Sequence, residues 1–243
     1  MRHNRLAVLA LAVPLALPFA GTAYAGGSAS ANLAPVPLNG SQASGTGMVT
    51  VTGNRIQFSL AASGLADGPH AAHIHFGASA RHECPTAAGD KNGDKRLSTT
   101  EGLPAYGPIV VSLTKTGDTS AKSGLAVDRF AKGKSIKYSR GSVTVAPEVA
   151  KAIEAGQAVV VVHGVAYTDA RKSAKSDLMP SLPASATDPA ICGILVSAPS
   201  GGASTGAGGA VSSSQSTTLI GLGGAALIFA AGAGTLVARR VRG

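Results

Sequence analysis

The chain is poor in aromatic side chains. Its 243 residues include no tryptophan, four tyrosines and five phenylalanines. It also lacks a basic stripe, because five of its 21 basic residues lie at the extreme ends, and removing them leaves 16 basic against 12 acidic residues, a net charge of about +4. Proteins that bind nucleic acid combine a basic face with stacking aromatic groups. This composition therefore excludes nucleic acid as a partner.

Cysteine is equally scarce. Cys84 and Cys192 are the only two in the sequence, so at most one intrachain disulfide can form. In an oxidising compartment, that bridge would close a loop of roughly a hundred residues and contribute about 4–5 kcal/mol in the chain-entropy model. The alternative is a pair of free, buried thiols. We expect the disulfide, because the N-terminus indicates export.

Residues 1–25 have the pattern of a secretory signal peptide. Arg2 and Arg5 precede an apolar run over 6–20, and Ala23-Tyr24-Ala25 supplies small residues at the cleavage position. A buried helix of a folded domain is the alternative. The two prolines inside the run argue against it.

The C-terminal end is also distinct from the folded part. Residues 199–216 are rich in Gly, Ser, Ala and Thr, which is typical of a flexible linker. Residues 217–238 carry no charge and are long enough to form a transmembrane helix. The Arg-rich tail 239–243 predicts a cytoplasmic end. An interfacial helix is disfavoured by the lack of a polar face, and a sortase signal by the missing Leu-Pro ahead of GASTG.

Between these ends, residues 27–198 form one domain that reads as β-structure. Residues 47–52 and 55–61 alternate apolar and polar side chains around Gly53-Asn54, which predicts a hairpin. Further strands rich in Val and Ile are expected at 70–76, 109–113, 135–138, 142–145, 158–163 and 191–196. Residues 147–155 predict the one short helix. The expected fold class is all-β, a Greek-key β-sandwich or barrel.

Three histidines fall within the stretch PHAAHIHFG at residues 69–77. On a strand, alternate side chains share a face, so His73 and His75 point the same way and His70 does not unless the strand bends. His163 ends the apolar strand AVVVV and is the candidate third imidazole. Three imidazoles without a thiolate suit copper or zinc. The alternative is that these histidines are structural.

Four segments in the same chain order resemble the Cu/Zn superoxide dismutase family. They are GPHAAHIHFG at 68–77, Cys84, VVVH at 160–163 and CGIL at 192–195. The resemblance implies a Greek-key barrel of that family's type. It also implies copper ligands at His73, His75 and His163, a Cys84–Cys192 disulfide, and a framework role for His70 through hydrogen bonds to backbone.

The departures from that family are specific. After Cys84 the sequence has no histidine until His163, so the bridging histidine and the other zinc histidines are absent. The loop 85–106 replaces them. Pro189 stands where the family has a guiding arginine, and His82 lies before Cys84, on the wrong side. We therefore expect copper without zinc.

A second resemblance is to the chordin-type CHRD domain. It rests on HIHFGA at 73–78, GPIVVSL at 107–113 and EVAKAIEAGQAVVVVHG at 148–164. That family has the same general β-architecture and no single established chemistry. The resemblance implies a surface domain whose histidines either hold a metal or are structural.

Residues 90–101 follow the pattern of an EF-hand calcium loop. The ligand positions fall on Asp90, Asn92, Asp94, the Arg96 carbonyl, Ser98 and Glu101. Lys95 stands where the loop needs a glycine with positive φ, which costs a side-chain-bearing residue about 1 kcal/mol. Gly102-Leu103-Pro104 argues against a helix after the loop. The alternative is a solvated polar loop.

These features predict a secreted copper protein, anchored in the plasma membrane by its C-terminal helix and exposed at the cell surface. The first hypothesis is dismutation of superoxide to oxygen and peroxide, with turnover weakened by the missing bridging histidine. The alternatives are non-catalytic copper binding and a structural or adhesive CHRD-type domain without metal. Superoxide or copper ion is the expected partner, and calcium a second cation.

Overall fold

The computed structural model describes residues 26–198. The expected signal peptide (1–25), linker (199–216), transmembrane helix (217–238) and cytoplasmic tail (239–243) lie outside the described residues. Within 26–198 no helix has the length and apolar character needed to cross a bilayer.

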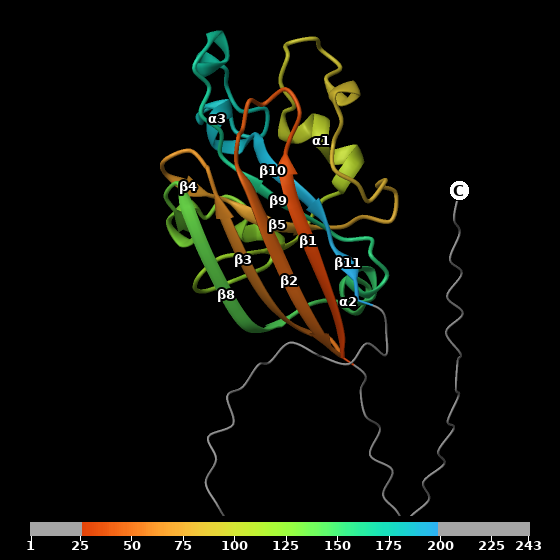
Figure 1. Ribbon diagram of the computed structural model, residues 1–243. Helices are drawn as coiled ribbons and strands as arrows, with labels where there is room; N and C mark the ends of the chain where they lie inside the picture. Colours follow the sequence, from red (N-terminus) through yellow and green to blue (C-terminus); the bar gives the residue numbers. More distant parts are fainter. Residues whose placement is uncertain (1–25, 199–243) are drawn as a thin grey trace, which may run out of the picture. The chain divides into compact units, whose positions relative to one another are not determined.

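The described residues form a mainly β structure, in which one antiparallel sheet curls into a half-barrel (Figure 1). Its strand order is β6-β5-β9-β10-β1-β2-β3-β8, with β11 also paired to β1. The strands are β1 (Gly27–Pro35), β2 (Ser44–Thr52), β3 (Arg55–Ser63), β5 (Ala72–His75), β6 (Ile109–Ser112), β8 (Ser135–Thr144), β9 (Val159–His163), β10 (Pro189–Ile194) and β11 (Val196–Ser197). A separate pair joins β4 (Pro69–His70) to β7 (Ala131–Lys132).

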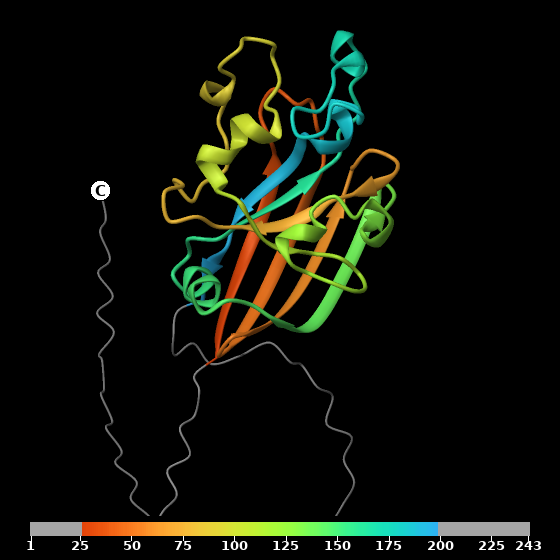
Figure 2. The ribbon, with the colours of Figure 1, turned by 180° about the vertical axis from the view of Figure 1, so that it is seen from behind.

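Three α-helices accompany the sheet in this region, where the sequence predicted one. They are α1 (Thr99–Tyr106), α2 (Pro147–Glu154) and α3 (Ala184–Thr187). Short 3₁₀ turns lie at Ala87–Gly89, Ala121–Ser123, Val127–Arg129 and Ala170–Ser173. Helices α1 and α3 lie at the same end of the sheet, as both views show (Figures 1 and 2).

The predicted hairpin at the start of the domain is confirmed. β2 and β3 pair from Thr52↔Arg55 to Ser44↔Ser63, and Gly53 takes the positive φ of 57° that the tight turn requires. Alternate residues are buried along both strands. The strands β1, β2, β3 and β8 therefore bury one face in the main core and expose the other.

The strand predicted over 158–163 is also confirmed, and it is buried on both faces. Val160 and Val162 pack in the main core, while Val159 and Val161 pack on the opposite side against Leu97 and Tyr106. This second layer exists because α1 and its loop cover the outer face of β9. Side chains on that face are therefore enclosed too.

Two predicted strands at 135–138 and 142–145 are one strand, β8. Ser142 has a φ of 60°, and the register with β3 shifts between Ile56 and Phe58. This is a β-bulge, which bends a strand without ending it. Conversely, the strand predicted over 70–76 is broken at Ala71 into β4 and β5, which belong to different sheets.

The single disulfide is confirmed. Cys84 and Cys192 are joined with a sulfur–sulfur distance of 2.02 Å. The bond ties the start of the loop that leads to α1 to strand β10. That loop is therefore fixed to the sheet at its beginning and, through the packing of Tyr106 on β9, at its end.

Candidate metal centre

Strands β5 and β9 bring three histidines to one face of the sheet. In their antiparallel pairing His73 lies opposite Val161, and His75 lies opposite Val159. Residues directly opposite each other share a face, so both histidines lie on the side covered by α1. His163 follows Val161 by two residues and shares that face. Ile74, between the two histidines, points into the main core.

The three imidazoles are close together and buried. One potential ligand atom from each ring lies within 4.8 Å of those of the other two. The ring centroids are 5.1 Å apart for His73 and His163, 5.5 Å for His73 and His75, and 6.2 Å for His75 and His163. Exposure is at most 3% for each residue. The structure thus brings together the three histidines that the sequence singled out.

Each ring is oriented by a backbone carbonyl. His73 Nε2 donates to the Gly124 carbonyl at 3.0 Å, and His75 Nδ1 to the Gly107 carbonyl at 2.8 Å. His163 Nδ1 donates to the Thr187 carbonyl at 2.5 Å. A neutral imidazole that donates from one nitrogen presents a lone pair on the other. These bonds therefore set the tautomer of all three rings.

The opposite nitrogens have no hydrogen-bond partner. They are His73 Nδ1, His75 Nε2 and His163 Nε2, the only buried side-chain nitrogen or oxygen atoms without one in the part of the chain described. An unpaired buried polar atom ordinarily destabilises the fold by about 1–3 kcal/mol. Three such atoms in one cluster fit a metal ion, since metal-binding histidines typically donate their second nitrogen to a carbonyl in this way.

Burial keeps the three rings neutral. It lowers the pKa of His75 to about 3 and of His163 to about 4. The pKa of His73 is also well below its usual value, first because of burial and then because of the neighbouring His163 and His75. Neutral imidazole is the form that ligates metal. At neutral pH the three rings are therefore in the form that a metal site requires.

Aromatic rings pack against the cluster. The ring of Tyr106 lies edge-on to His75 at 4.5 Å, and Phe130 lies edge-on to His73 at 5.5 Å. Tyr106 folds back over Gly102, where a Cβ would lie 2.5 Å from its ring, and its hydroxyl donates to the Thr99 carbonyl at 2.9 Å. Neither aromatic contact was foreseen from the sequence. The spacing GxxxY within 102–106 was the only available signal.

His70 lies beside the cluster without joining it. Its Nδ1 is 2.9 Å from the His163 carbonyl, and its Nε2 is 2.8 Å from the Ala66 carbonyl. Gly164 makes room for this ring, because a Cβ there would lie 2.7 Å from His70 Nδ1. His82 bonds the Gly77 carbonyl at 2.9 Å and stacks on Phe76, away from the three-histidine cluster.

The loop 90–101 brings part of its expected ligand set together. Carboxylate oxygens of Asp90, Asp94 and Glu101 lie within 4.8 Å of one another. Lys95 has the positive φ, 62°, that the loop pattern requires at its position. Asn92 accepts from the Asp94 amide at 2.8 Å.

The remaining loop positions have structural contacts. The Arg96 side chain turns inward to the buried Asp188, at 3.0 Å. Ser98 caps α1, whose Glu101 completes a capping box. The expectation that Gly102-Leu103-Pro104 argues against a helix after the loop is therefore wrong, because α1 runs through all three. The capping box starts the helix in spite of them.

A hydrogen bond connects this segment to the histidines. Thr99, the first residue of α1, donates its hydroxyl to the Thr187 carbonyl at 2.6 Å, the same oxygen that accepts from His163. At the other end of α1, the C-cap Gly107 supplies the carbonyl for His75. One short helix thus contributes to the orientation of two of the three rings.

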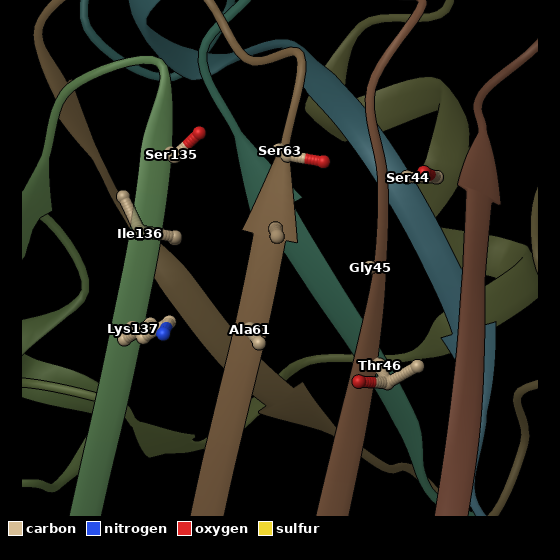
Figure 3. Close-up of a pocket in the computed structure, with 9 residues that line it drawn as sticks. Ser44, Gly45, Thr46, Ala61, Ser63, Ser135, Ile136 and Lys137 are labelled. Atoms are coloured by element: carbon tan, nitrogen blue, oxygen red, sulfur yellow. The ribbon is translucent and has the colours of Figure 1, made fainter.

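Another hollow lies away from the histidines. It has a volume of about 610 Å³ and lies on the solvent-facing side of β2, β3 and β8 (Figure 3). Its wall is formed by Ser44, Gly45, Thr46, Ala61, Ala62, Ser63, Ser135, Ile136 and Lys137. Lys137 is the only charged residue of that wall. A shallow, hydroxyl-lined hollow of this kind offers no chemistry comparable to the histidine cluster.

Comparison with known proteins places these features in a family. The sequence profile described as the CHRD domain matches residues 26–170, which include all three histidines and the loop 90–101. No curated protein matches the chain. Because the matched region covers more than half of the sequence, the chain belongs to the CHRD domain family.

Proposed function

We propose that this CHRD domain is a copper-binding domain that acts outside the cell. The observation that carries the proposal is the set of three buried imidazole nitrogens without a partner, on His73, His75 and His163. Each second nitrogen is already held by a carbonyl, as in known metal-binding histidines. A structural role would leave the three free nitrogens unexplained.

Copper fits the donor set better than the alternatives. Imidazole suits copper and zinc, and of the two divalent ions copper binds nitrogen ligands more tightly. Hard cations such as magnesium prefer oxygen, which this cluster lacks. When bound, copper supplies one-electron exchange between its Cu(II) and Cu(I) states. His73, His75 and His163 would hold it, and the carbonyls of Gly124, Gly107 and Thr187 would keep their rings in place.

Superoxide dismutation is the second candidate function. Its support is the resemblance of residues 68–77, 160–163 and 192–195 to the dismutase family, together with a donor set of one Nδ1 and two Nε2 atoms. The zinc ligands and the guiding arginine of that family are missing from the sequence, as noted above. We therefore propose slow turnover at most, with copper binding as the primary property.

Two further proposals accompany the copper site. Export by residues 1–25 and anchoring by residues 217–238 would place the domain at the cell surface, where a disulfide persists. The loop 90–101 would bind calcium, supported by the convergence of Asp90, Asp94 and Glu101 and by the positive φ of Lys95.

The test is metal binding by the purified protein and by three single variants, His73→Gln, His75→Gln and His163→Gln. We expect one copper ion per wild-type chain, a Cu(II) spectrum with nitrogen hyperfine coupling, and loss of both in each variant. His82→Gln is the matched control, since His82 lies outside the cluster, and it should retain copper. Retained copper in all three cluster variants would refute the site. Retained copper in the wild type without superoxide decay would remove only the second candidate.

A further inference from the structure

The three histidines form part of the wall of a cavity of about 500 Å³. Four other segments complete this wall: the N-terminus of α1, strand β6, the turn and loop over 121–125, and the region over 178–187. The remaining lining residues are Ala71, Thr99, Ile109, Ala121, Lys122, Gly124, Leu125, Leu178, Met179, Ala186 and Thr187. We call this space the histidine cavity.

The volume exceeds what a metal ion and a diatomic ligand require. A water molecule occupies roughly 30 Å³ of liquid, whereas sites for small organic ligands typically measure about 300–1,000 Å³. The histidine cavity lies within that range. Its size is therefore sufficient for a small organic molecule.

The residues of the cavity wall indicate which class of organic molecule would bind. Leu125, Leu178 and Met179 line the cavity while remaining 37%, 50% and 39% exposed, so they form an apolar rim open to solvent. Large apolar side chains that line a cavity and stay exposed are typical of a binding site. Lys122 is the only charged residue of the wall, and no carboxylate lines it. A ligand with an anionic end and a hydrocarbon body matches this pattern.

We propose that the histidine cavity binds a small amphipathic carboxylate. Its carboxylate would be attracted by Lys122 and by the cation proposed at the histidines, and its hydrocarbon body would contact Leu125, Leu178 and Met179, all of which line the cavity. This assignment rests on the proposed copper site, because the histidine end of the cavity attracts an anion most strongly when a cation is held there. The proposal adds to the copper site the chemical class of the molecule that would bind beside the metal.

The test uses hexanoate, acetate and hexylammonium as probes, titrated into the purified full-length protein with and without copper. Calorimetry measures affinity, and the Cu(II) absorption band reports contact with the site. We expect hexanoate to bind at least about tenfold more tightly than acetate, because each buried methylene raises affinity roughly fourfold. Hexylammonium, with the same body and the opposite charge, should bind too weakly to measure.

Variants separate the rim from the metal site. In Leu178→Ser/Met179→Ser we expect the affinity for hexanoate to fall about tenfold, toward that of acetate, with copper content unchanged. Both residues are exposed, so the fold is not at risk. Leu103→Ser is the matched control, since Leu103 is 43% exposed and does not line the cavity. Lys122→Gln should weaken the binding of both carboxylates.

The titrations separate a failure of carboxylate binding from a failure of copper binding. Equal affinities for hexanoate and acetate in protein that holds copper would overturn the ligand assignment and leave the proposed function standing. If no copper binds, the proposed function fails, and the titration of metal-free protein decides the present proposal. Hexanoate binding that depends on Leu178 and Met179 would then support it, and no binding would overturn it.

Discussion

At the scale of single residues, the three imidazoles are neutral and their free nitrogens are fixed in place. His75 and His163 present Nε2 and His73 presents Nδ1, because different backbone carbonyls hold the other nitrogen of each ring. The rings stay neutral because burial disfavours the charged form. The same burial affects the stability of the metal-free protein. At acid pH the unfolded chain binds protons on these histidines and the folded state does not, so the free energy of unfolding falls.

The metal-free protein is therefore expected to lose stability between pH 6.5 and 5. The unfolded chain takes up protons on these histidines near their usual pKa of about 6.5. In the folded state the pKa is about 3 for His75 and about 4 for His163, and burial also holds the pKa of His73 well below its usual value. Stability is thus fully present above pH 6.5 and falls as the pH decreases. Asp188 has the opposite effect on stability. Burial raises its pKa to about 6, so the folded state binds a proton there at a higher pH than the unfolded chain does. The net loss at pH 5 is on the order of 2–5 kcal/mol.

Urea unfolding at a series of pH values measures this dependence. Aspartates and glutamates of an unfolded chain titrate below about pH 5, so they contribute little in the chosen window. A midpoint that stays constant from pH 7.5 to 5 would contradict the assignment of neutral, buried rings.

Lys95 shows backbone strain at a position where a glycine would have none. Its φ of 62° disfavours a side chain by about 1 kcal/mol. We expect Lys95→Gly to raise the free energy of unfolding by up to about 1 kcal/mol, reduced by the entropy that glycine adds to the unfolded chain. Calcium affinity should rise with it. Thermal unfolding with and without calcium checks both effects.

Lys91→Gly is the matched control, because Lys91 lies in the same loop without a positive φ. It should be neutral or destabilising. Equal effects of the two substitutions would show that strain at Lys95 has no energetic weight.

At the scale of elements, the strands with strong patterns were predictable, whereas β1 and α1 were among the elements that were not. The β2–β3 hairpin and β9 follow directly from alternation and from a run of valines. β1 was missed because its buried positions hold Ala29, Ala31 and Leu33, mostly small residues with weak periodicity. Its burial comes from the neighbours β2 and β10, which the local sequence does not reveal.

Helix α1 was missed for a different reason. Gly102 and Pro104 are both poor helix formers, and Pro104 removes one backbone donor. The capping box of Ser98 and Glu101 and the packing of Tyr106 over Gly102 outweigh them. The histidine triad itself was predictable from spacing, but the carbonyls that orient its rings lie on loops and helix ends, where side-chain patterns carry no information.

Thr99, the first residue of α1, is expected to position His163, because both side chains donate to the Thr187 carbonyl. Thr99→Val removes the hydroxyl that shares the Thr187 carbonyl with His163 and keeps the branched shape. We expect copper affinity to fall roughly tenfold, the lower end of effects from residues behind metal ligands. Competition with a chelator measures the affinity, and the Cu(II) spectrum should show altered coupling.

Thr100→Val provides the comparison. Thr100 is exposed, and valine retains the backbone amide that donates to Asp177 while removing a hydroxyl that does not bond the Thr187 carbonyl. The two substitutions should therefore differ. A similar loss of affinity in both variants would mean that α1 is merely destabilised, and no loss in either would mean that Thr99 does not position the site.

At the scale of the domain, the proposed copper ligands and the disulfide lie on different pairs of elements. His73, His75 and His163 lie on β5 and β9, which pair with each other. The disulfide joins Cys84, at the start of the loop toward α1, to Cys192 on β10. The disulfide therefore reaches the histidines through α1 and through β10, where Cys192 lies opposite Val161 of β9. The pairing of β5 with β9 does not itself require the disulfide, so the sheet can keep the histidines together without it.

The double variant Cys84→Ser/Cys192→Ser is accordingly expected to lose stability and keep its copper. A disulfide that closes a loop of this length restricts the unfolded chain and contributes up to about 4–5 kcal/mol, with 2–4 kcal/mol being typical. Denaturant unfolding should show a loss in that range, while copper content stays at one per chain under native conditions. Copper affinity should fall modestly, since α1 holds the Gly107 carbonyl at His75 and is tethered less firmly. A complete loss of copper in a variant that remains folded would show that the metal centre depends on the covalent link, and that β5 and β9 do not hold it by themselves.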